Sequence, residues 1–333
     1  MVGPRVVELP QIQPYIKKEH TIMCKAIPVE QRVGVALYKL AHSPSYRQLS
    51  GPLAVSPSAC QEICEEVFCM ICCHLYPKYI KFPDEQELHN QMDSFNTYKG
   101  MPMCVGAVDG SHIPIKAPRH GAASYYNRKG FHSVGLQAAV NFSGAFIDTC
   151  TGFPGKAHDS RVYRNSSLSE DLGTGRVFPE YFRQLIEGVY VYPYLLGDAA
   201  YGLHVHLMKG YTGYGLSIDQ EWFNTQLSSA RMCVERAFGR LKGRWRILQV
   251  PCQFDNLLSI CRMVTACCVL HNICEAANET YTKAWEETGT EQQMWKDDYR
   301  ELADEEESLV ETGPKEKIKI LEVDQQACPH EAK

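Results

Sequence analysis

The sequence predicts an α/β fold built from a sheet of four strands and one long helix. Three observations support this prediction. Apolar, strand-like runs alternate with turn signals between residues 103 and 196. A stripe of apolar residues at alternating steps of four and three follows between residues 219 and 247. Acidic residues stand on the first strand, directly after the fourth strand, and on the long helix.

Residues 28–76, which precede the sheet, are predicted to form helices. Ser56 followed by Pro57 is typical of a helix start, because the serine caps free backbone N–H groups and proline suits the first turn. An earlier helix is predicted from an apolar stripe that consists of Val33, Leu37, Leu40 and Ala41.

These helices form the outline of a helix-turn-helix unit, with a short helical piece at residues 45–50 between the two longer ones. The last helix carries Glu62, Glu65 and Glu66 and no Lys or Arg before His74. Such a surface is unfavourable for the phosphate-lined groove of DNA. We therefore favour a structural helical cap over a DNA-reading unit, and both interpretations remain open.

The strands are predicted from apolar, β-compatible runs. Residues 103–115, 133–142 and 145–151 give three consecutive strands, and Ser143-Gly144 marks a hairpin turn between the last two. A fourth buried strand is predicted at residues 189–196, and it ends at Gly197-Asp198.

A long amphipathic helix is predicted at residues 219–247, followed by an apolar helix at 257–274. Glu235 directly follows Val234 of the apolar stripe and so lies about 100° round the helix, at the edge of the buried face. Four strands followed by a long helix, with carboxylates at these places, is the ribonuclease H-like order. The stripe consists of Phe223, Leu227, Ala230, Val234, Phe238, Leu241 and Trp245.

Composition indicates a globular protein. The chain has 333 residues, 44% of them apolar and 22% charged, which leaves room for about two domains. No apolar run reaches the roughly 18 residues of a membrane span, and the N-terminus lacks a signal-peptide core. We expect an intracellular protein without membrane contact.

The fifteen cysteines are expected to be reduced thiols, because their number is odd and the chain is long. The nearest metal pattern, Cys69-Met-Ile-Cys72-Cys73, lacks a second Cys/His pair at zinc spacing. Core packing is favoured over zinc, because thiols behave as small apolar groups. The helical stripe that supports this consists of Cys60, Cys64, Val67, Phe68, Ile71 and Leu75.

The formal net charge of −5 is unevenly distributed. Residues 281–333 contain fifteen Asp or Glu and seven Lys or Arg, a balance of −8, which leaves residues 1–280 at +3. This acidic tail is expected to be flexible and solvated, and it could shield a basic surface.

Asp109, Asp198 and Glu235 are candidate metal ligands. Cleavage of a phosphodiester requires an activated water and a stabilised leaving oxygen, which two Mg²⁺ or Mn²⁺ ions about 3.5–4 Å apart can supply. Mg²⁺ typically takes one or two carboxylates from the protein. Taken singly, Asp109 could mark a strand-end turn, Asp198 could cap the next segment, and Glu235 could pair with Arg231 on a solvated face.

Six sequence blocks resemble the PIF/Harbinger transposases, most closely the domesticated Harbinger transposase-derived nucleases, and the likeness covers roughly residues 10–275. The blocks are Cys104-Val-Gly-Ala-Val-Asp-Gly-Ser-His-Ile113, Tyr125-Tyr-Asn-Arg-Lys-Gly-Phe-His-Ser133, Gly155-Lys-Ala-His-Asp-Ser160, Leu195-Leu-Gly-Asp-Ala-Ala-Tyr201, Val234-Glu-Arg-Ala-Phe-Gly-Arg-Leu-Lys-Gly-Arg-Trp245 and Cys268-Val-Leu-His-Asn272.

The resemblance implies a ribonuclease H-like DDE domain that binds Mg²⁺ or Mn²⁺ through Asp109, Asp198 and Glu235. Asp159 is a fourth acid of the family pattern, which we treat as an accessory or alternative second ligand. The resemblance also implies DNA as substrate and a separate Myb/SANT-like protein that supplies DNA targeting and nuclear delivery. A nuclear location is expected, with the cytoplasm also compatible, and an oligomer is compatible with the sequence.

Basic residues near these blocks are candidates for contacts with the DNA backbone, although about half could be ordinary surface charges. His112 and His158 could assist proton transfer, but a structural role is favoured for both. The DNA-binding candidates are Lys116, Arg128, Lys129, Arg231, Arg240, Lys242 and Arg244.

The primary prediction is a transposase-derived, metal-dependent endonuclease. The alternatives are a DNA- or protein-binding adaptor without turnover and an intact transposase, which the acidic character of the N-terminal helices disfavours. The expected domains are an N-terminal extension at 1–27, a helix-turn-helix-like region at 28–98, the ribonuclease H-like DDE nuclease domain at 99–278 and the acidic tail at 279–333.

Overall fold

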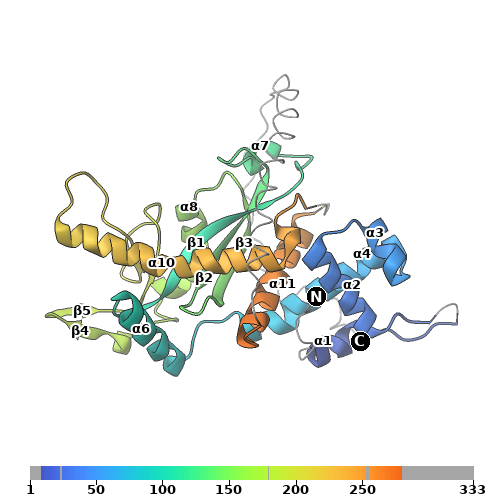
Figure 1. The fold of residues 1–333 in the computed structure, drawn as a ribbon, viewed down its shortest axis with the longest axis horizontal. Helices are drawn as coiled ribbons and strands as arrows, with labels where there is room; N and C mark the ends of the chain where they lie inside the picture. The colour runs from blue at the N-terminus through green and yellow to red at the C-terminus, as the bar shows by residue number, and fades with distance from the viewer. Residues whose placement is uncertain (1–8, 23–24, 179, 253–255, 280–333) are drawn as a thin grey trace, which may run out of the picture.

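A five-stranded mixed sheet forms the centre of the computed structural model, which describes residues 9–22, 25–178, 180–252 and 256–279 (Figure 1). The strand order is β3-β2-β1-β6-β7; β2 runs antiparallel to β1 and β3, whereas β6 and β7 run parallel to β1. This arrangement is consistent with the ribonuclease H-like order. The strands are β1 (Cys104–Pro114), β2 (Ser133–Val140), β3 (Phe146–Pro154), β6 (Tyr194–Leu196) and β7 (Leu207–Met208).

The hairpin between β2 and β3 forms where the sequence predicted it. Gly144 has a φ of 95°, a conformation that glycine adopts without strain, and its N–H donates to the Asn141 carbonyl at 3.1 Å. The side chain of Asn141 accepts a hydrogen bond from the N–H of Ala145 at 2.9 Å. The turn signal at Ser143-Gly144 is thereby confirmed.

The prediction of a single strand at residues 189–196 was wrong. Its first part is β5 (Val189–Val191), which pairs with β4 (Gln184–Ile186) in a separate hairpin, and only β6 joins the main sheet. Pro193 lies between the two strands and has no N–H to donate to a β-ladder, so the strand is interrupted there.

The long helix α10 (Ile218–Arg244) packs on β1 and β2, along which it runs in Figure 1. It begins at Ser217, whose hydroxyl accepts a hydrogen bond from the N–H of Gln220 at 3.3 Å. The predicted apolar stripe is confirmed, since six of its members are buried and Phe223 is half-buried. The buried members are Leu227, Ala230, Val234, Phe238, Leu241 and Trp245.

The helix α11 (Leu257–Ala276) packs on β3 and α10. Within the described residues it is one stretch that has the length and apolarity of a membrane span, with a mean hydropathy of 1.7, contrary to the expectation that no such run exists. Because 83% of that window is buried inside the protein, α11 has the environment of a core helix.

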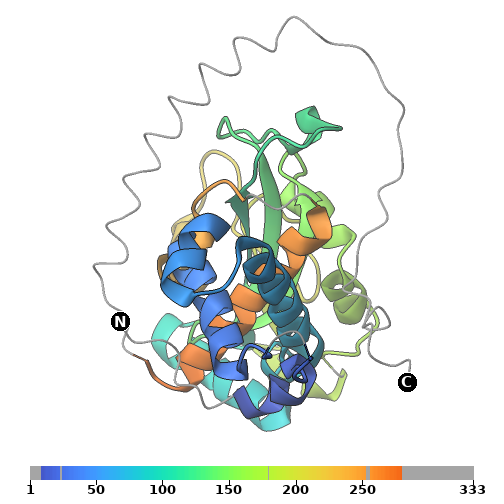
Figure 2. The same ribbon diagram turned by 90° about the vertical axis from the view of Figure 1, so that its right-hand side faces the viewer.

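Among the helices that precede the sheet, α4, η2 and α5 pack against α11, whereas α6 packs on β1, and Figure 2 shows the blue helices in front of α11. As predicted, α4 begins after Ser56, whose hydroxyl accepts from the N–H of Ala59 at 3.3 Å, and the cysteine-containing stripe is buried. The helix-turn-helix-like role and the domain boundaries stay predictions. The helices are α1 (Leu9–Ile16), α2 (Val29–His42), α3 (Tyr46–Leu53), α4 (Pro57–Met70), the π-helical turn η2 (Ile71–Leu75), α5 (Tyr76–Tyr79) and α6 (Glu85–Lys99).

Short helices complete the described chain, whereas residues 280–333, which hold nearly all of the predicted acidic tail, lie outside it. The short elements are α7 (Ala122–Tyr125), α8 (Asp159–Arg164), α9 (Ser167–Gly173) and two 3₁₀ turns, η3 (Glu180–Phe182) and η4 (Arg246–Leu248).

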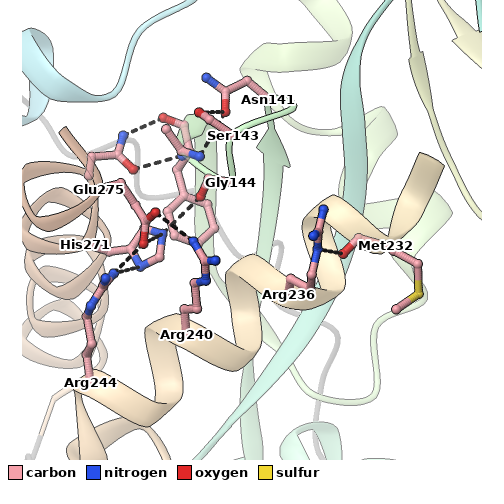
Figure 3. A network of polar contacts seen from close by, with 12 residues as sticks. Asn141, Ser143, Gly144, Met232, Arg236, Arg240, Arg244, His271 and Glu275 are labelled. Carbon is pink, nitrogen blue, oxygen red and sulfur yellow. Dashed lines mark hydrogen bonds and ion pairs between the residues drawn. The ribbon is translucent and has the colours of Figure 1, made fainter. Parts of the chain in front are cut away.

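A polar network fastens α10 to α11 and to the β2–β3 turn (Figure 3). Glu275 of α11 pairs with Arg240 at 2.8 Å and with Arg244 at 2.6 Å, both from α10. His271 accepts from Arg244 through Nδ1 at 3.1 Å, so its Nε2 carries the proton that is donated to the carbonyl of Gly144 at 3.0 Å. These contacts give His271 a structural role.

His271 is expected to make the protein less stable as the pH falls. Burial, more than any neighbouring charge, lowers its pKa to about 4, below the ordinary 6.5 or so. The unfolded chain therefore binds a proton first, so the stability contributed by neutral His271 is complete above about pH 6.5 and decreases as the pH falls towards 4. Between about pH 7 and pH 5 the loss is about 2 kcal/mol.

Urea unfolding at the two pH values measures this loss as a difference between the wild type and His271→Gln. Glutamine keeps a donor for Gly144 but does not titrate, so its free energy of unfolding should depend less on pH. Equal pH dependence in the two proteins would contradict the prediction.

Candidate metal centre

Asp109 and Asp198 come from neighbouring parallel strands. Ala107 of β1 pairs with Leu196 of β6, and each aspartate lies two residues further along its chain. Beyond this point β6 ends, whereas β1 continues and pairs with β2. Because parallel strands point their carboxyl ends to the same edge of a sheet, Asp109 and Asp198 meet where this edge opens.

Asp159, the first residue of α8, reaches the same edge. A Cβ atom added to Gly110 would lie 2.3 Å from Oδ1 of Asp159, so the carboxylate sits directly over the backbone beside Asp109. The backbone carbonyl of Asp159 accepts a hydrogen bond from Nε2 of Gln137 at 3.2 Å. The same nitrogen donates to the hydroxyl of buried Tyr201 at 3.0 Å, which links β2 to the loop after Asp198.

The three aspartates act on one another electrostatically. Burial is the main cause that raises the pKa of Asp109, and the charges of Asp198 and Asp159 add to it, whereas the Gly110 N–H and Arg231 oppose it. The pKa of Asp159 is also raised, first by burial and then by Asp198. Mutually repelling, half-buried carboxylates are typical of a functional site and favour a bound cation.

Glu235 lies on α10 between two residues that contact β1. Arg231, four residues before it, donates to Oδ2 of Asp109 at 3.1 Å, and Lys242, seven residues after it, donates to the carbonyl of His112 at 2.9 Å. The carboxylate of Glu235 itself is exposed. This exposure agrees with a position outside the buried stripe, and an orientation of Glu235 towards the sheet stays a prediction.

The oxygen donors suit a hard cation only in part. Among the residues that the structure describes, no group of three or more His, Cys, Asp or Glu side chains is arranged to hold a metal ion. Asp109 with Asp198 or Asp159 provides the one or two carboxylates that Mg²⁺ takes from a protein. The three-ligand set that includes Glu235 stays a prediction, as does the choice between Asp159 and Asp198.

The basic candidates fall into two groups. Lys116, Arg128 and Lys129 are exposed, and Arg128 contacts His158 beside Asp159. The other candidates, Arg231, Arg240, Lys242 and Arg244, all have partners inside the protein.

Arg244 is the candidate whose position agrees least with a contact to the DNA backbone. Its side chain is 5% exposed and is committed to Glu275, so its guanidinium is not available to DNA phosphates in this structure. Lys242 is only partly buried, but its ammonium is enclosed, and this burial lowers its pKa to about 8. Both residues therefore hold α10 in place.

Gln137 and Tyr201 are site residues that the sequence did not single out. Tyr201 is the last residue of the block Leu195–Tyr201, in which only Asp198 was named as a candidate. Gln137 is a buried polar residue between apolar neighbours in β2. A polar residue at a buried strand position was the available signal, because such a group needs a hydrogen-bond partner.

The chain is similar in sequence to several known proteins. A family model described as a DDE superfamily endonuclease matches residues 108–272, a segment that contains all four acids. "Protein ALP1-like" of Arabidopsis thaliana is 26% identical over 259 residues, which cover 74% of this chain and 61% of that protein. "Putative nuclease HARBI1" of Rattus norvegicus and of Homo sapiens are each 32% identical over 200 residues, which cover 59% of this chain and 53% of theirs.

The chain thus spans between about half and two thirds of the length of these relatives. No solved structure matches it.

Proposed function

Because this chain belongs to the Harbinger transposase-derived family of DDE superfamily endonucleases, we propose that it is a metal-dependent nuclease that cleaves DNA. The observation that best supports this proposal is the meeting of Asp109, Asp159 and Asp198 at one open edge of the sheet, where burial and the charge of Asp198 raise the pKa values of Asp109 and Asp159. Carboxylates in this state gain most from a divalent cation.

Each residue has a defined task in the proposed reaction. Asp109 and Asp198 would hold the cations, Glu235 would complete the set from α10, and Asp159 would be the accessory ligand. Arg231 fixes the orientation of the Asp109 carboxylate through its 3.1 Å contact. When bound, a pair of Mg²⁺ or Mn²⁺ ions supplies an activated water and stabilises the leaving oxygen.

DNA approaches over the exposed cations Lys116, Arg128 and Lys129, which lie outside the internal ion pairs described above. Contacts of this kind are made to phosphates and give affinity that falls steeply with salt but little sequence information. A Myb/SANT-like partner in the nucleus would provide the missing sequence recognition.

Metal removal tests the proposed function. Purified full-length protein is incubated with supercoiled plasmid in the presence of Mg²⁺, Mn²⁺ or EDTA, with and without a Myb-like partner. We expect nicked or linear DNA with Mg²⁺ or Mn²⁺ and intact plasmid with EDTA, because the carboxylates alone cannot activate water. Plasmid that stays intact with both metals, with the partner present, would contradict the proposal.

A second candidate function is a DNA- or protein-binding adaptor without turnover. The exposed carboxylate of Glu235, which stands outside any metal-binding group in the described residues, favours it. Its signature in the same experiment is salt-dependent DNA binding without metal-dependent cleavage. An intact transposase would instead require terminal inverted repeats beside the gene, which flanking genomic sequence reveals.

A further inference from the structure

A cavity of about 550 Å³ opens beside the aspartates. Its walls come from α8, α9 and the loop after Asp198. The lining residues Ser160 and Ala200 follow Asp159 and Asp198 by one and two positions in the chain. Tyr201 forms part of its wall. Because Gln137 donates hydrogen bonds to both Tyr201 and the carbonyl of Asp159, Tyr201 connects the cavity to the candidate metal centre.

The cavity carries positive charge. Arg164 donates through Nε to the carbonyl of Ser160 at 3.2 Å, and Lys209 donates to the carbonyl of Ala199 at 3.5 Å. Neither cation has an ion pair with a carboxylate among the described residues, in contrast to Arg176 at the end of α9, which pairs with two acids. Two such cations beside a nuclease site are suited to a phosphate group.

The rest of the cavity is suited to a base. Leu203, which is 66% exposed, supplies the accessible apolar surface, and the buried rings of Tyr163 and Tyr201 pack edge to face in the wall, with centroids 5.7 Å apart. The hydroxyl-bearing side chains of Ser160 and Ser169 add hydrogen-bonding groups. Aromatic and apolar surfaces accept the flat face of any base, whereas a free phosphate would need only the cations.

Its volume points to a single nucleotide. Cavities of roughly 300–1,000 Å³ enclose small-molecule ligands, whereas a DNA duplex is too wide to enter a cavity of this size. A base can enter only when it leaves the helical stack, which costs least where it is unpaired.

We propose that this cavity binds one unpaired nucleotide of the substrate strand next to the scissile phosphate, with Arg164 and Lys209 on its phosphate and Leu203 against its base. The proposal rests on the proposed function, because it assumes DNA at the aspartates. It adds a preference for DNA that is unpaired beside the cut.

Binding of two DNAs tests the nucleotide subsite. One is a short duplex that carries 2-aminopurine as its single unpaired nucleotide, and the other is the same duplex fully paired; both are titrated with the full chain in Ca²⁺. We expect about tenfold tighter binding of the unpaired form, since stacking of one base contributes that much. The fluorescence of 2-aminopurine should change as the base enters the cavity.

Variants of the lining residues decide whether the cavity is responsible. The double variant Arg164→Ala/Lys209→Ala should reduce the affinity ratio of the two DNAs to about one, and Leu203→Ser should weaken the fluorescence change. Arg246→Ala removes an exposed cation beyond the end of α10 and should leave the ratio unchanged.

The outcomes separate the two proposals. Equal binding of both DNAs by the wild type, or an undiminished preference in the double variant, overturns the nucleotide subsite and leaves the nuclease proposal intact. Failure of the wild type to bind either DNA overturns both.

Discussion

Asp109→Asn is expected to reduce metal-dependent cleavage by a factor of at least about 10³, because the amide replaces a charged oxygen ligand in the reacting centre. Asp109 lies on β1 and faces both other aspartates, so no neighbouring group can take its position. Single-turnover cleavage of labelled DNA in Mg²⁺ or Mn²⁺ measures the effect.

The same variant should be at least as stable as the wild type in EDTA. The pKa of Asp109 is raised in the folded protein, so the carboxyl contributes stability at low pH and loses it as the pH rises through the raised value. At neutral pH its charge destabilises the fold, and the neutral amide removes that cost. Loss of cleavage without loss of stability would therefore identify a functional carboxylate.

Asp148→Asn is a matched control on β3. Burial raises the pKa of Asp148 to about 7, as burial also raises that of Asp109, but Asp148 is not among the acids of the candidate centre. Its substitution should leave cleavage unchanged. Wild-type cleavage in Asp109→Asn, or equal losses in both variants, would contradict the assignment of Asp109.

The second ligand can be identified in the same assay. We expect Asp198→Asn to match the loss in Asp109→Asn, and Asp159→Asn to cause a smaller one, since Asp198 follows the strand parallel to β1. The reverse order would make Asp159 the second ligand.

Glu275→Ala is expected to lower the free energy of unfolding by about 3–5 kcal/mol, because it leaves a buried charge uncompensated. Glu275 accepts from both Arg240 and Arg244, and the Arg244 side chain is 5% exposed (Figure 3). Equilibrium unfolding in urea at neutral pH measures the change.

Glu170→Ala provides the control, because it also breaks an ion pair between a glutamate and an arginine. The pair of Glu170 with Arg176 is exposed, with side chains 72% and 58% accessible, and such pairs contribute about 0–1 kcal/mol. A loss below about 1 kcal/mol in Glu275→Ala would mean that the network does not hold α10 on α11.

Local patterns were sufficient to predict much of the fold. The apolar runs of β1 to β3, the turn at Ser143-Gly144 and the 3-4 stripe of α10 each depend on residues close in sequence. Pro193 is a sequence signal for the break between β5 and β6, but the continuous apolar run around it favoured the prediction of one strand. Pairing of β6 with β1 involves residues far apart in the chain, so no local pattern predicts it.

The acidic residues of the candidate site could be predicted from the sequence, but the contacts around them could not. The position of Asp159 depends on the missing side chain of Gly110, a contact between separate segments that no local pattern records. Arg244 has the sequence context of a surface cation, and its burial follows from the packing of α11 against α10. Long-range packing therefore decides which cations remain exposed.

The hairpin of β4 and β5 offers a place to engineer this protein. Its strands pair only with each other among the described strands, and Leu185, Val189 and Tyr190 are exposed. Replacing its tip by a purification tag, a fluorescent reporter or a programmable DNA-binding module would break no hydrogen bond of the main sheet. The aspartates would keep their supports, so the hairpin is a graft point from which the specificity of the molecule could be redirected without rebuilding its centre.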